Sequence, residues 1–262
     1  MQTGSIYITR WGQSGPRVVL VHGGTQGSRD GADRQFAAQK PLADSGWQLV
    51  IPDRPGHGRS PDPGRPDDAE ADGAWVADLL EGGAHLVGHS FGGCVALAAA
   101  AKRPSAVHSL TLIEPGMQAL AIGDPSVKKL VFRIVTTLML SWSAVSRARR
   151  MMKLLGIPPE VSGRFSRDDL QRIGKSIRRA KLPSKAVLER QLAEIKRAGV
   201  PLVVVSGGWS PAFEATADKV AAVGGGRRIV IDAGNHFPHF IADKFNAALT
   251  AFMIESDANR RR

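Results

Sequence analysis

Residues 84–101 read AHLVGHSFGGCVALAAAA, which is a short apolar strand, a turn with one serine, and a strong helix former. Ser90 must lie in a sharp turn, and Gly88 and Gly92 leave room for it, because a β-carbon at either place would collide with neighbouring backbone. The turn lifts the serine hydroxyl clear of the sheet and puts the Phe91 N–H at a helix N-terminus, where it can meet a developing oxyanion. The alternative is a glycine-rich turn whose serine only caps the helix.

Strand-like and helix-like stretches alternate on both sides of this turn, which predicts an α/β fold with a mostly parallel sheet flanked by helices. Between residues 116 and 198, however, no stretch reads as a good strand. We therefore expect a core domain of residues 1–115 and 199–262. Residues 116–198 would be inserted as a helical lid over the carboxyl ends of the strands, where open α/β sheets bind ligands.

Hydrophobic periodicity and turn residues give approximate bounds for each element. The expected strands are 6–10, 17–21, 47–51, 84–87, 108–113, 201–206 and 227–232. The expected helices are 34–45, 69–80, 93–101, 127–140, 145–155, 167–179, 185–197, 211–223 and 239–255.

The composition fits one large domain, or a core domain with an insertion, since 43% of the 262 residues are hydrophobic. Cys94 is the single cysteine, so no disulfide can form within the chain. No run of eighteen apolar residues occurs, and the N-terminus enters a strand-like stretch without the core of a signal peptide. These features predict a cytoplasmic protein without stable membrane insertion.

The net charge of +11 is concentrated in one segment. Residues 124–198 hold 18 Lys and Arg against 6 Asp and Glu, so the rest of the chain is close to neutral. One interpretation is a solvated helical face, and the other is steering of anionic substrates or loose attraction to an acidic membrane surface. No base-stacking or zinc motif accompanies the charge, so we expect no nucleic-acid partner.

Four motifs occur along the chain: HGG at 22–24, DRPGHGRS at 53–60, GHSFG at 88–92 and AGNH at 233–236. In their order and spacing the chain resembles the α/β-hydrolase fold, over nearly its whole length outside the lid. The resemblance implies that Ser90 is the nucleophile and that His236, after the last strand, is the base. A serine alcohol is a weak nucleophile until a positioned imidazole takes its proton. His239, three residues on, is the rival base.

The resemblance also implies an oxyanion hole that combines the N–H groups of Phe91 and Gly24. We expect His22 to shape the loop that carries Gly24 and to lie beside the substrate. Trp142 and Trp209 are the other expected substrate contacts. No metal-binding cluster or cofactor loop is visible in the sequence, and the expected reaction needs neither.

The chain departs from the family pattern at the acid of the triad. Relatives usually carry an aspartate just after the family's seventh strand, and Ser210 stands there in this sequence. The best replacement is Glu114, just after the family's sixth strand, a position that haloalkane dehalogenases and zearalenone lactonases use. The alternative for Glu114 is a lid-hinge residue paired with a lid arginine. Weaker candidates for the acid are Glu214, Asp218 and Asp232.

These residues together predict a serine hydrolase that cleaves a small carboxylic ester or lactone through an acyl-enzyme. A second hypothesis is a hydrolase-fold protein that binds a ligand and has lost efficient catalysis, because Ser210 occupies the acid position. A third is a C–C bond hydrolase, an acyltransferase or a cofactor-free haloperoxidase on the same triad. A homodimer is left open as a partner.

Overall fold

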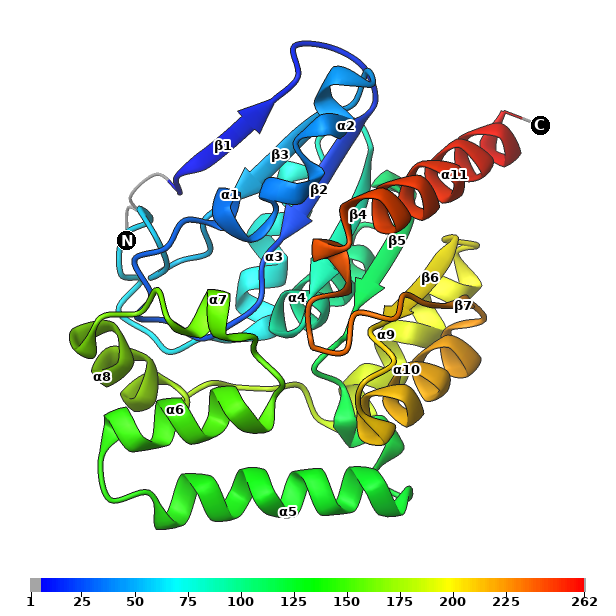
Figure 1. The fold of residues 1–262 in the computed structure, drawn as a ribbon. Helices are drawn as coiled ribbons and strands as arrows, with labels where there is room; N and C mark the ends of the chain where they lie inside the picture. Colours follow the sequence, from blue (N-terminus) through cyan, green and yellow to red (C-terminus); the bar gives the residue numbers. More distant parts are fainter. Residues whose placement is uncertain (1–5, 262) are drawn as a thin grey trace.

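The computed structural model describes residues 6–261 (Figure 1) and forms one seven-stranded sheet. The strand order is β1-β3-β2-β4-β5-β6-β7, and β1 is antiparallel to β3 while the other pairs are parallel. The predicted α/β fold is therefore confirmed. The strands are β1 (Ile8–Trp11), β2 (Arg17–Val21), β3 (Gln48–Pro52), β4 (Ala84–His89), β5 (Val107–Ile113), β6 (Leu202–Ser206) and β7 (Arg227–Val230).

Helices cover both faces of this sheet, so its inner strands β2, β4, β5 and β6 are buried on both sides, whereas the edge strands β1 and β7 are not. In β2, Val19 and Val21 pack toward α3, α4, α9 and α10, while Val18 and Leu20 pack toward α1, α2 and α11. The helices are α1 (Ala32–Gln35), α2 (Pro41–Asp44), α3 (Ala69–Leu79), α4 (Phe91–Lys102), α5 (Pro125–Leu140), α6 (Ala144–Leu154), α7 (Pro159–Ser162), α8 (Arg167–Ser176), α9 (Lys185–Arg197), α10 (Pro211–Gly224) and α11 (Ala242–Arg260). Short 3-10 turns are η1 (Ala37–Gln39), η2 (Pro104–Ala106), η3 (Gln118–Ala121) and η4 (Pro238–Phe240).

The single helix expected over residues 34–45 was wrong in detail, because the chain there forms α1, η1 and α2 in succession. Pro41 explains the break between η1 and α2: it has no N–H to donate to a preceding turn, and it begins α2 instead. The short helix α7 was not expected from the sequence.

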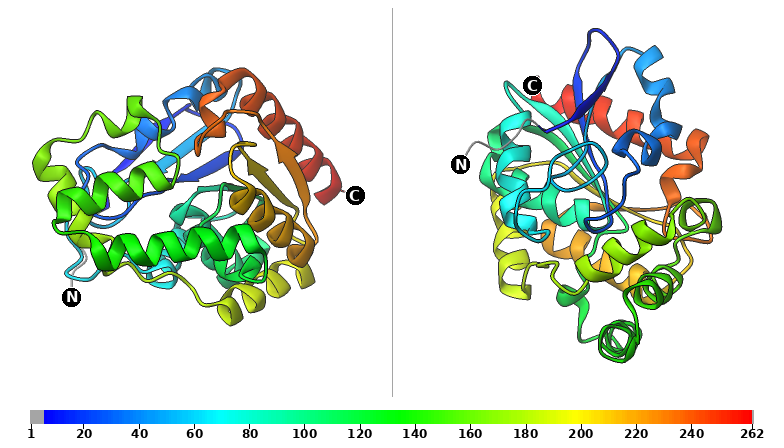
Figure 2. Two further views of the ribbon diagram at one scale, coloured as in Figure 1. Left: turned by 60° about the horizontal axis from the view of Figure 1, so that its bottom comes forward. Right: turned by 90° about the vertical axis from the view of Figure 1, so that its left-hand side faces the viewer.

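The inserted segment divides into two parts (Figures 1 and 2). Helices α5–α8 lie together below the carboxyl ends of the parallel strands. Helix α9 instead packs against α4 and α10, and its Leu188, Leu192 and Ile195 are buried in the same core as the sheet. The packing of α9 thus differs from that of a lid helix, although its residues were expected within the lid.

Candidate active site

Ser90 lies in the turn between β4 and α4. Its backbone angles, φ 55° and ψ −120°, fall in a region that residues with a side chain rarely adopt. A β-carbon at Gly88 would collide with the carbonyl oxygen of Gly92, and one at Gly92 would collide with that of Val21. The two glycines therefore permit the close packing that holds the serine at the carboxyl end of β4.

Ser90, His236 and Glu114 form one chain of hydrogen bonds. Ser90 Oγ donates to His236 Nε2 over 2.9 Å, and His236 Nδ1 donates to Glu114 Oε2 over 3.1 Å. His89 joins the first two loops, because its Nε2 donates to the backbone carbonyl of His236 over 2.9 Å. The three side chains follow β4, β5 and β7, so the common edge at which parallel strands end brings them together.

Glu114 is fully buried, and hydrogen bonds hold its carboxylate. Oε1 accepts the Gly207 N–H over 2.6 Å, and Oε2 accepts the Trp209 indole N–H over 3.0 Å in addition to the His236 ring. A buried carboxylate needs such donors because water no longer solvates it. Within residues 6–261 no lysine or arginine pairs with Glu114. The alternative role of Glu114, as a hinge residue paired with a lid arginine, therefore has no support among these residues.

The other candidates for acid and base have different surroundings. Glu214 and Asp218 both pair with Arg228, at 2.6 and 2.7 Å, and Asp232 is exposed. The rival base His239 is buried in η4, where desolvation lowers its pKa to about 3.

The loop after β2 lies against Ser90. A β-carbon at Gly23 would come within 2.8 Å of the Ser90 Cβ, and Gly24 is exposed with φ 79°. Arg54, which is fully buried, donates from Nη2 to the Gly24 carbonyl over 2.7 Å. Among the described residues, the N–H groups of Gly24 and Phe91 have no acceptor, so both are available to a ligand atom.

His22 holds this loop through the backbone. Its Nδ1 donates to the Gly23 carbonyl over 2.8 Å, and its Nε2 accepts the Arg54 N–H over 2.9 Å. Burial, followed by repulsion from His57 and Arg54, keeps the pKa of His22 well below its usual value, so the ring is neutral as this pattern requires. Both ring nitrogens are occupied, which leaves none for a substrate.

The two tryptophans expected beside a substrate differ in position. Trp142 is 86% exposed at the turn between α5 and α6, and its indole N–H donates to Ser146 Oγ over 2.7 Å. Trp209 reaches the carboxylate of Glu114, and its ring meets that of His236 edge-on with centroids 6.3 Å apart. Sequence reasoning missed the link from Trp209 to Glu114, since 95 residues separate the two.

The inserted segment contacts both sides of the site. The carbonyl of Gly156, which follows α6, accepts the His236 N–H over 3.1 Å. Arg172 on α8 donates from Nε to the Gly27 carbonyl over 3.0 Å, in the loop that continues from Gly24. The insertion is thus tied to the loop of His236 and to the loop beside Ser90.

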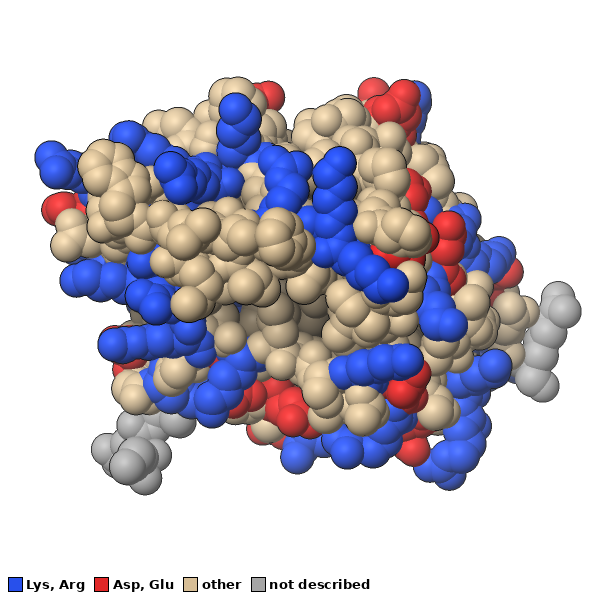
Figure 3. Space-filling model, turned by 90° about the horizontal axis from the view of Figure 1, so that it is seen from below, with Lys and Arg blue, Asp and Glu red and all other residues tan. Residues whose placement is uncertain are grey.

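A cavity of about 760 Å³ lies where the loop after Gly24 meets α8 and the loop of residues 56–66. Five cationic side chains line it, against Asp62 as the only acid among the lining residues. Two of the cations are paired, Arg65 with Asp72 and Arg172 with Asp169, whereas the other three have no ionic partner among the described residues. The three are Arg29, Lys175 and Arg179. Seen from below, the molecule is hollowed between groups of Lys and Arg (Figure 3).

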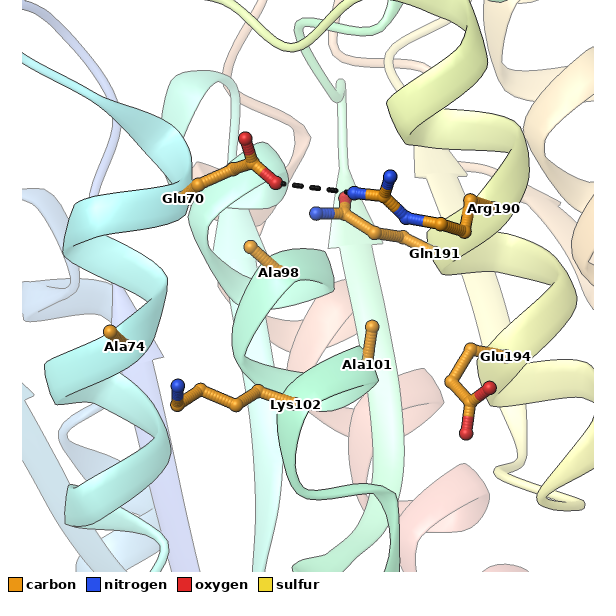
Figure 4. Close-up of a pocket in the computed structure, with 8 residues that line it drawn as sticks. All are labelled: Glu70, Ala74, Ala98, Ala101, Lys102, Arg190, Gln191 and Glu194. Carbon is orange, nitrogen blue, oxygen red and sulfur yellow. Dashed lines mark ion pairs between the residues drawn. The ribbon is translucent and has the colours of Figure 1, made fainter.

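A second cavity, of about 410 Å³, lies between α3, α4 and α9 (Figure 4). Ala98 and Ala101 leave space on α4, and Glu70 and Arg190 pair across the opening at 3.5 Å. None of the residues that line it belongs to the Ser90 site, and we assign it no chemistry.

Comparisons with known proteins agree with this architecture. Residues 18–248 match the sequence model of the alpha/beta hydrolase family. The lipase LipV of Mycobacterium tuberculosis is 37% identical over 131 residues, which cover 48% of this chain and 46% of that protein. The pimeloyl-[acyl-carrier protein] methyl ester esterase of Neisseria meningitidis serogroup C is 38% identical over 97 residues, 37% of this chain and 35% of that protein. These matches thus span less than half of either curated relative.

Among solved structures, the enol-lactonase of Burkholderia xenovorans LB400 superposes with a TM-score of 0.67. The superposition covers 95% of this chain and 96% of that one at 20% identity, so it shows a shared fold. In residues 6–261 no helix is both long enough and apolar enough to cross a membrane.

Proposed function

The chain belongs to the alpha/beta hydrolase family, and we propose that it is a serine hydrolase that cleaves a carboxylic ester or lactone. The observation that carries this proposal is the chain of hydrogen bonds from Ser90 through His236 to Glu114. The lipase and esterase activities named for its relatives, and the enol-lactonase of like fold, support the same class of reaction.

In the proposed reaction, Ser90 Oγ attacks the carbonyl carbon while His236 Nε2 takes the hydroxyl proton. Glu114 holds the imidazole in the tautomer that can accept this proton, and its charge stabilises the imidazolium that forms. The N–H groups of Phe91 and Gly24 donate to the oxyanion. His236 then protonates the leaving alcohol, and in the second half it takes a proton from the water that releases the acyl group.

We also propose that α5–α8 form a cap over this site. Two contacts support the cap: the Gly156 carbonyl holds the backbone of His236, and Arg172 holds the loop beside Ser90. A cap at this place excludes water from part of the site and shapes the space for the substrate.

The basic cavity favours a substrate that carries a carboxylate or phosphate in addition to its ester. Arg29, Lys175 and Arg179 have no described ionic partner, so an anionic group would face less competition there. Their exposure limits the attraction, because solvent and salt screen exposed charges.

The binding-protein hypothesis rests on Ser210, a neutral residue at the usual acid position. The carboxylate of Glu114 at His236 Nδ1 argues against it, because the imidazole already has an acidic partner. An acyltransferase or another reaction on the same triad would be recognised by a new ester product when an alcohol acceptor is added to the assay.

Fluorophosphonate labelling tests the proposal directly. The wild-type protein should be modified at Ser90, as mapped by mass spectrometry, and Ser90→Ala should remain unmodified at the same probe concentration. If the wild-type protein remains unlabelled although its circular dichroism is native, Ser90 is not an activated nucleophile. The hypothesis of a ligand-binding protein would then be favoured.

A further inference from the structure

A second cluster of reactive side chains lies at the opposite end of the sheet. His85 is the second residue of β4, His108 is the second residue of β5, and Asp257 lies in the last turns of α11. Ser90 lies five positions after His85 along the extended chain, about 16 Å at the usual rise per residue. The cluster is thus independent of the Ser90 site and of its proposed function.

A β-bulge brings the two histidines to one place. Ala84 pairs with Val107 and His85 pairs with Ser109, so His108 is the extra residue of β5. A bulge of this kind re-aims a side chain that regular alternation would send to the other face. As a result, the His85 and His108 rings meet edge-on with centroids 5.4 Å apart.

The ring nitrogens that face Asp257 lack hydrogen-bond partners. His85 is fully buried, and within the described residues neither its Nε2 nor His108 Nδ1 has one. The two nitrogens lie 3.5 and 3.8 Å from Asp257 Oδ1, beyond an ordinary hydrogen bond. A buried nitrogen without a partner is unusual and calls for a physical reason.

We propose that His85 Nε2, His108 Nδ1 and a carboxylate oxygen of Asp257 bind a divalent transition-metal ion, with Zn²⁺ the best match. All three atoms lie within 4.8 Å of one another. Tetrahedral Zn²⁺ with bonds of about 2.0–2.1 Å places its ligand atoms roughly 3.3 Å apart. The two distances to Asp257 Oδ1 exceed this by a few tenths of an ångström. The bound of 4.8 Å on the separation of the two histidine nitrogens exceeds it by about 1.5 Å, so the side chains must rotate toward the ion to complete the site.

The surroundings of the three ligands fit such an ion. His85 Nδ1 lies 2.8 Å from Ser109 Oγ, and donation to that oxygen fixes the tautomer whose Nε2 carries the lone pair. Burial lowers the pKa of His85 to about 4 and also lowers that of His108, which keeps both rings neutral at pH 7, as metal binding requires. His108 and Asp257 are each 18% exposed, which gives an ion access and leaves a fourth position for water.

One charge opposes the ion, and it provides a test. Arg260, one turn after Asp257, repels positive charge at both histidines. Because the ligands come from β4, β5 and α11, the ion would pin the C-terminal helix to the sheet and act on stability, not on the chemistry at Ser90. From the sequence we expected no metal-binding cluster. His108 lies 23 positions after His85, and Asp257 lies 149 positions after His108, so the three residues form no recognisable motif.

The experiment uses the full-length chain without a histidine tag, stripped with a chelator and titrated with ZnCl₂ by calorimetry. We expect one equivalent to bind and the unfolding midpoint to rise by roughly 5 °C in excess Zn²⁺. Co²⁺ should give the visible absorption typical of four-coordinate cobalt. Asp257→Asn and His108→Asn should lose this binding, and Ser109→Ala should weaken it by about 10- to 100-fold. Arg260→Ala should tighten it.

Asp243→Asn is the matched control, since it makes the same change at an exposed position in the first turn of the same helix. It should bind Zn²⁺ as the wild type does. Asp257→Asn and His108→Asn change partly exposed side chains, and circular dichroism checks that each variant is folded. Failure of the wild type to bind one equivalent at millimolar Zn²⁺ would overturn the proposal. Equal binding by folded Asp257→Asn would overturn it as well, because the ion would then lie elsewhere.

Discussion

Glu114 receives three hydrogen bonds, and they have different origins. The backbone of Gly207 and the side chain of Trp209 both come from the loop after β6, while His236 follows β7. The loop that carries Ser210 in place of the usual acid thus supplies donors to a carboxylate on the neighbouring strand. At the scale of single residues, this exchange supports the proposed triad, in which the acid lies one strand away from its usual place.

Glu114→Gln should lower kcat by about 10⁴-fold while leaving KM nearly unchanged. The amide cannot stabilise imidazolium, and it favours the wrong tautomer of His236. Steady-state kinetics on an activated ester measures both constants. Glu214→Gln is the control, since Glu214 is another candidate for the acid. This variant should retain near-normal kcat per folded molecule. A Glu114→Gln variant with near-normal kcat would exclude Glu114 as the acid.

Trp209→Phe should lower kcat by about tenfold, because it removes a hydrogen bond to a charged group but keeps an aromatic ring in place. Trp142→Phe is the matched control, since Trp142 is exposed and should leave kcat unchanged. The two variants are compared on the same neutral ester. Equal kcat values would show that Trp209 does not support Glu114 in catalysis.

At the scale of elements, two buried histidines lie under α11. His239 in η4 contacts Phe245 near the start of the helix, with ring centroids 6.1 Å apart, and His85 lies beside Asp257 near its end. Burial lowers both pKa values, to about 3 for His239 and about 4 for His85. Both rings are therefore neutral in the folded protein at pH 7.

This burial predicts that the free energy of unfolding decreases at acidic pH, because the two histidines packed under α11 must become protonated. The unfolded chain binds protons at these histidines below their ordinary pKa of 6.5, while the folded protein does not, so the free energy of unfolding is largest above pH 6.5. It should fall as the pH decreases from about 6.5 toward 3–4. Urea unfolding of metal-free protein at several pH values measures the slope. His239→Phe should flatten the slope, and an unchanged slope in that variant would assign the effect to other groups.

The sequence predicts most elements of this fold to within a few residues, because apolar runs mark β2, β5 and β6 clearly. It fails where tertiary packing decides. Pro41 breaks a helix that the composition favours, and α9 has the pattern of any amphipathic helix, so only its contacts with α4 show that it joins the core. Local pattern carries no information on which neighbour an apolar face meets.

In the candidate site, too, some residues could be predicted from the sequence and others could not. Motifs with fixed spacing identify Ser90, His236 and the loop of Gly24, and a strand-end position suggests Glu114. The donors that hold Glu114, the bulge at His108 and the contacts of the insertion join residues far apart in the sequence. No local pattern marks such contacts, so only the folded structure could reveal them.

At the scale of the whole molecule, the positive charge gathers in the inserted segment, next to the site. Lys175 and Arg179 belong to this segment, whereas Arg29 comes from the loop after β2, whose first residues lie against Ser90. Charges on both walls of one cavity raise the local concentration of an anionic substrate more than the same charges spread over the surface. The two interpretations of the basic segment therefore predict different results, since a merely solvated face would not distinguish substrates by charge.

The double variant Lys175→Ala, Arg179→Ala should therefore lower kcat/KM for an ester with a free carboxylate by about tenfold, and leave kcat/KM for its neutral analogue unchanged. Raising the salt concentration should reduce the wild-type preference in the same direction, because the Debye length shrinks from about 10 Å at 0.1 M to about 3 Å at 1 M. Lys219→Ala, an exposed cation on α10 outside the cavity lining, is the control and should change neither substrate. If the double variant and the wild type discriminate equally, or if salt leaves the preference intact, the cavity does not select anions. The charge of the segment would then serve solvation alone.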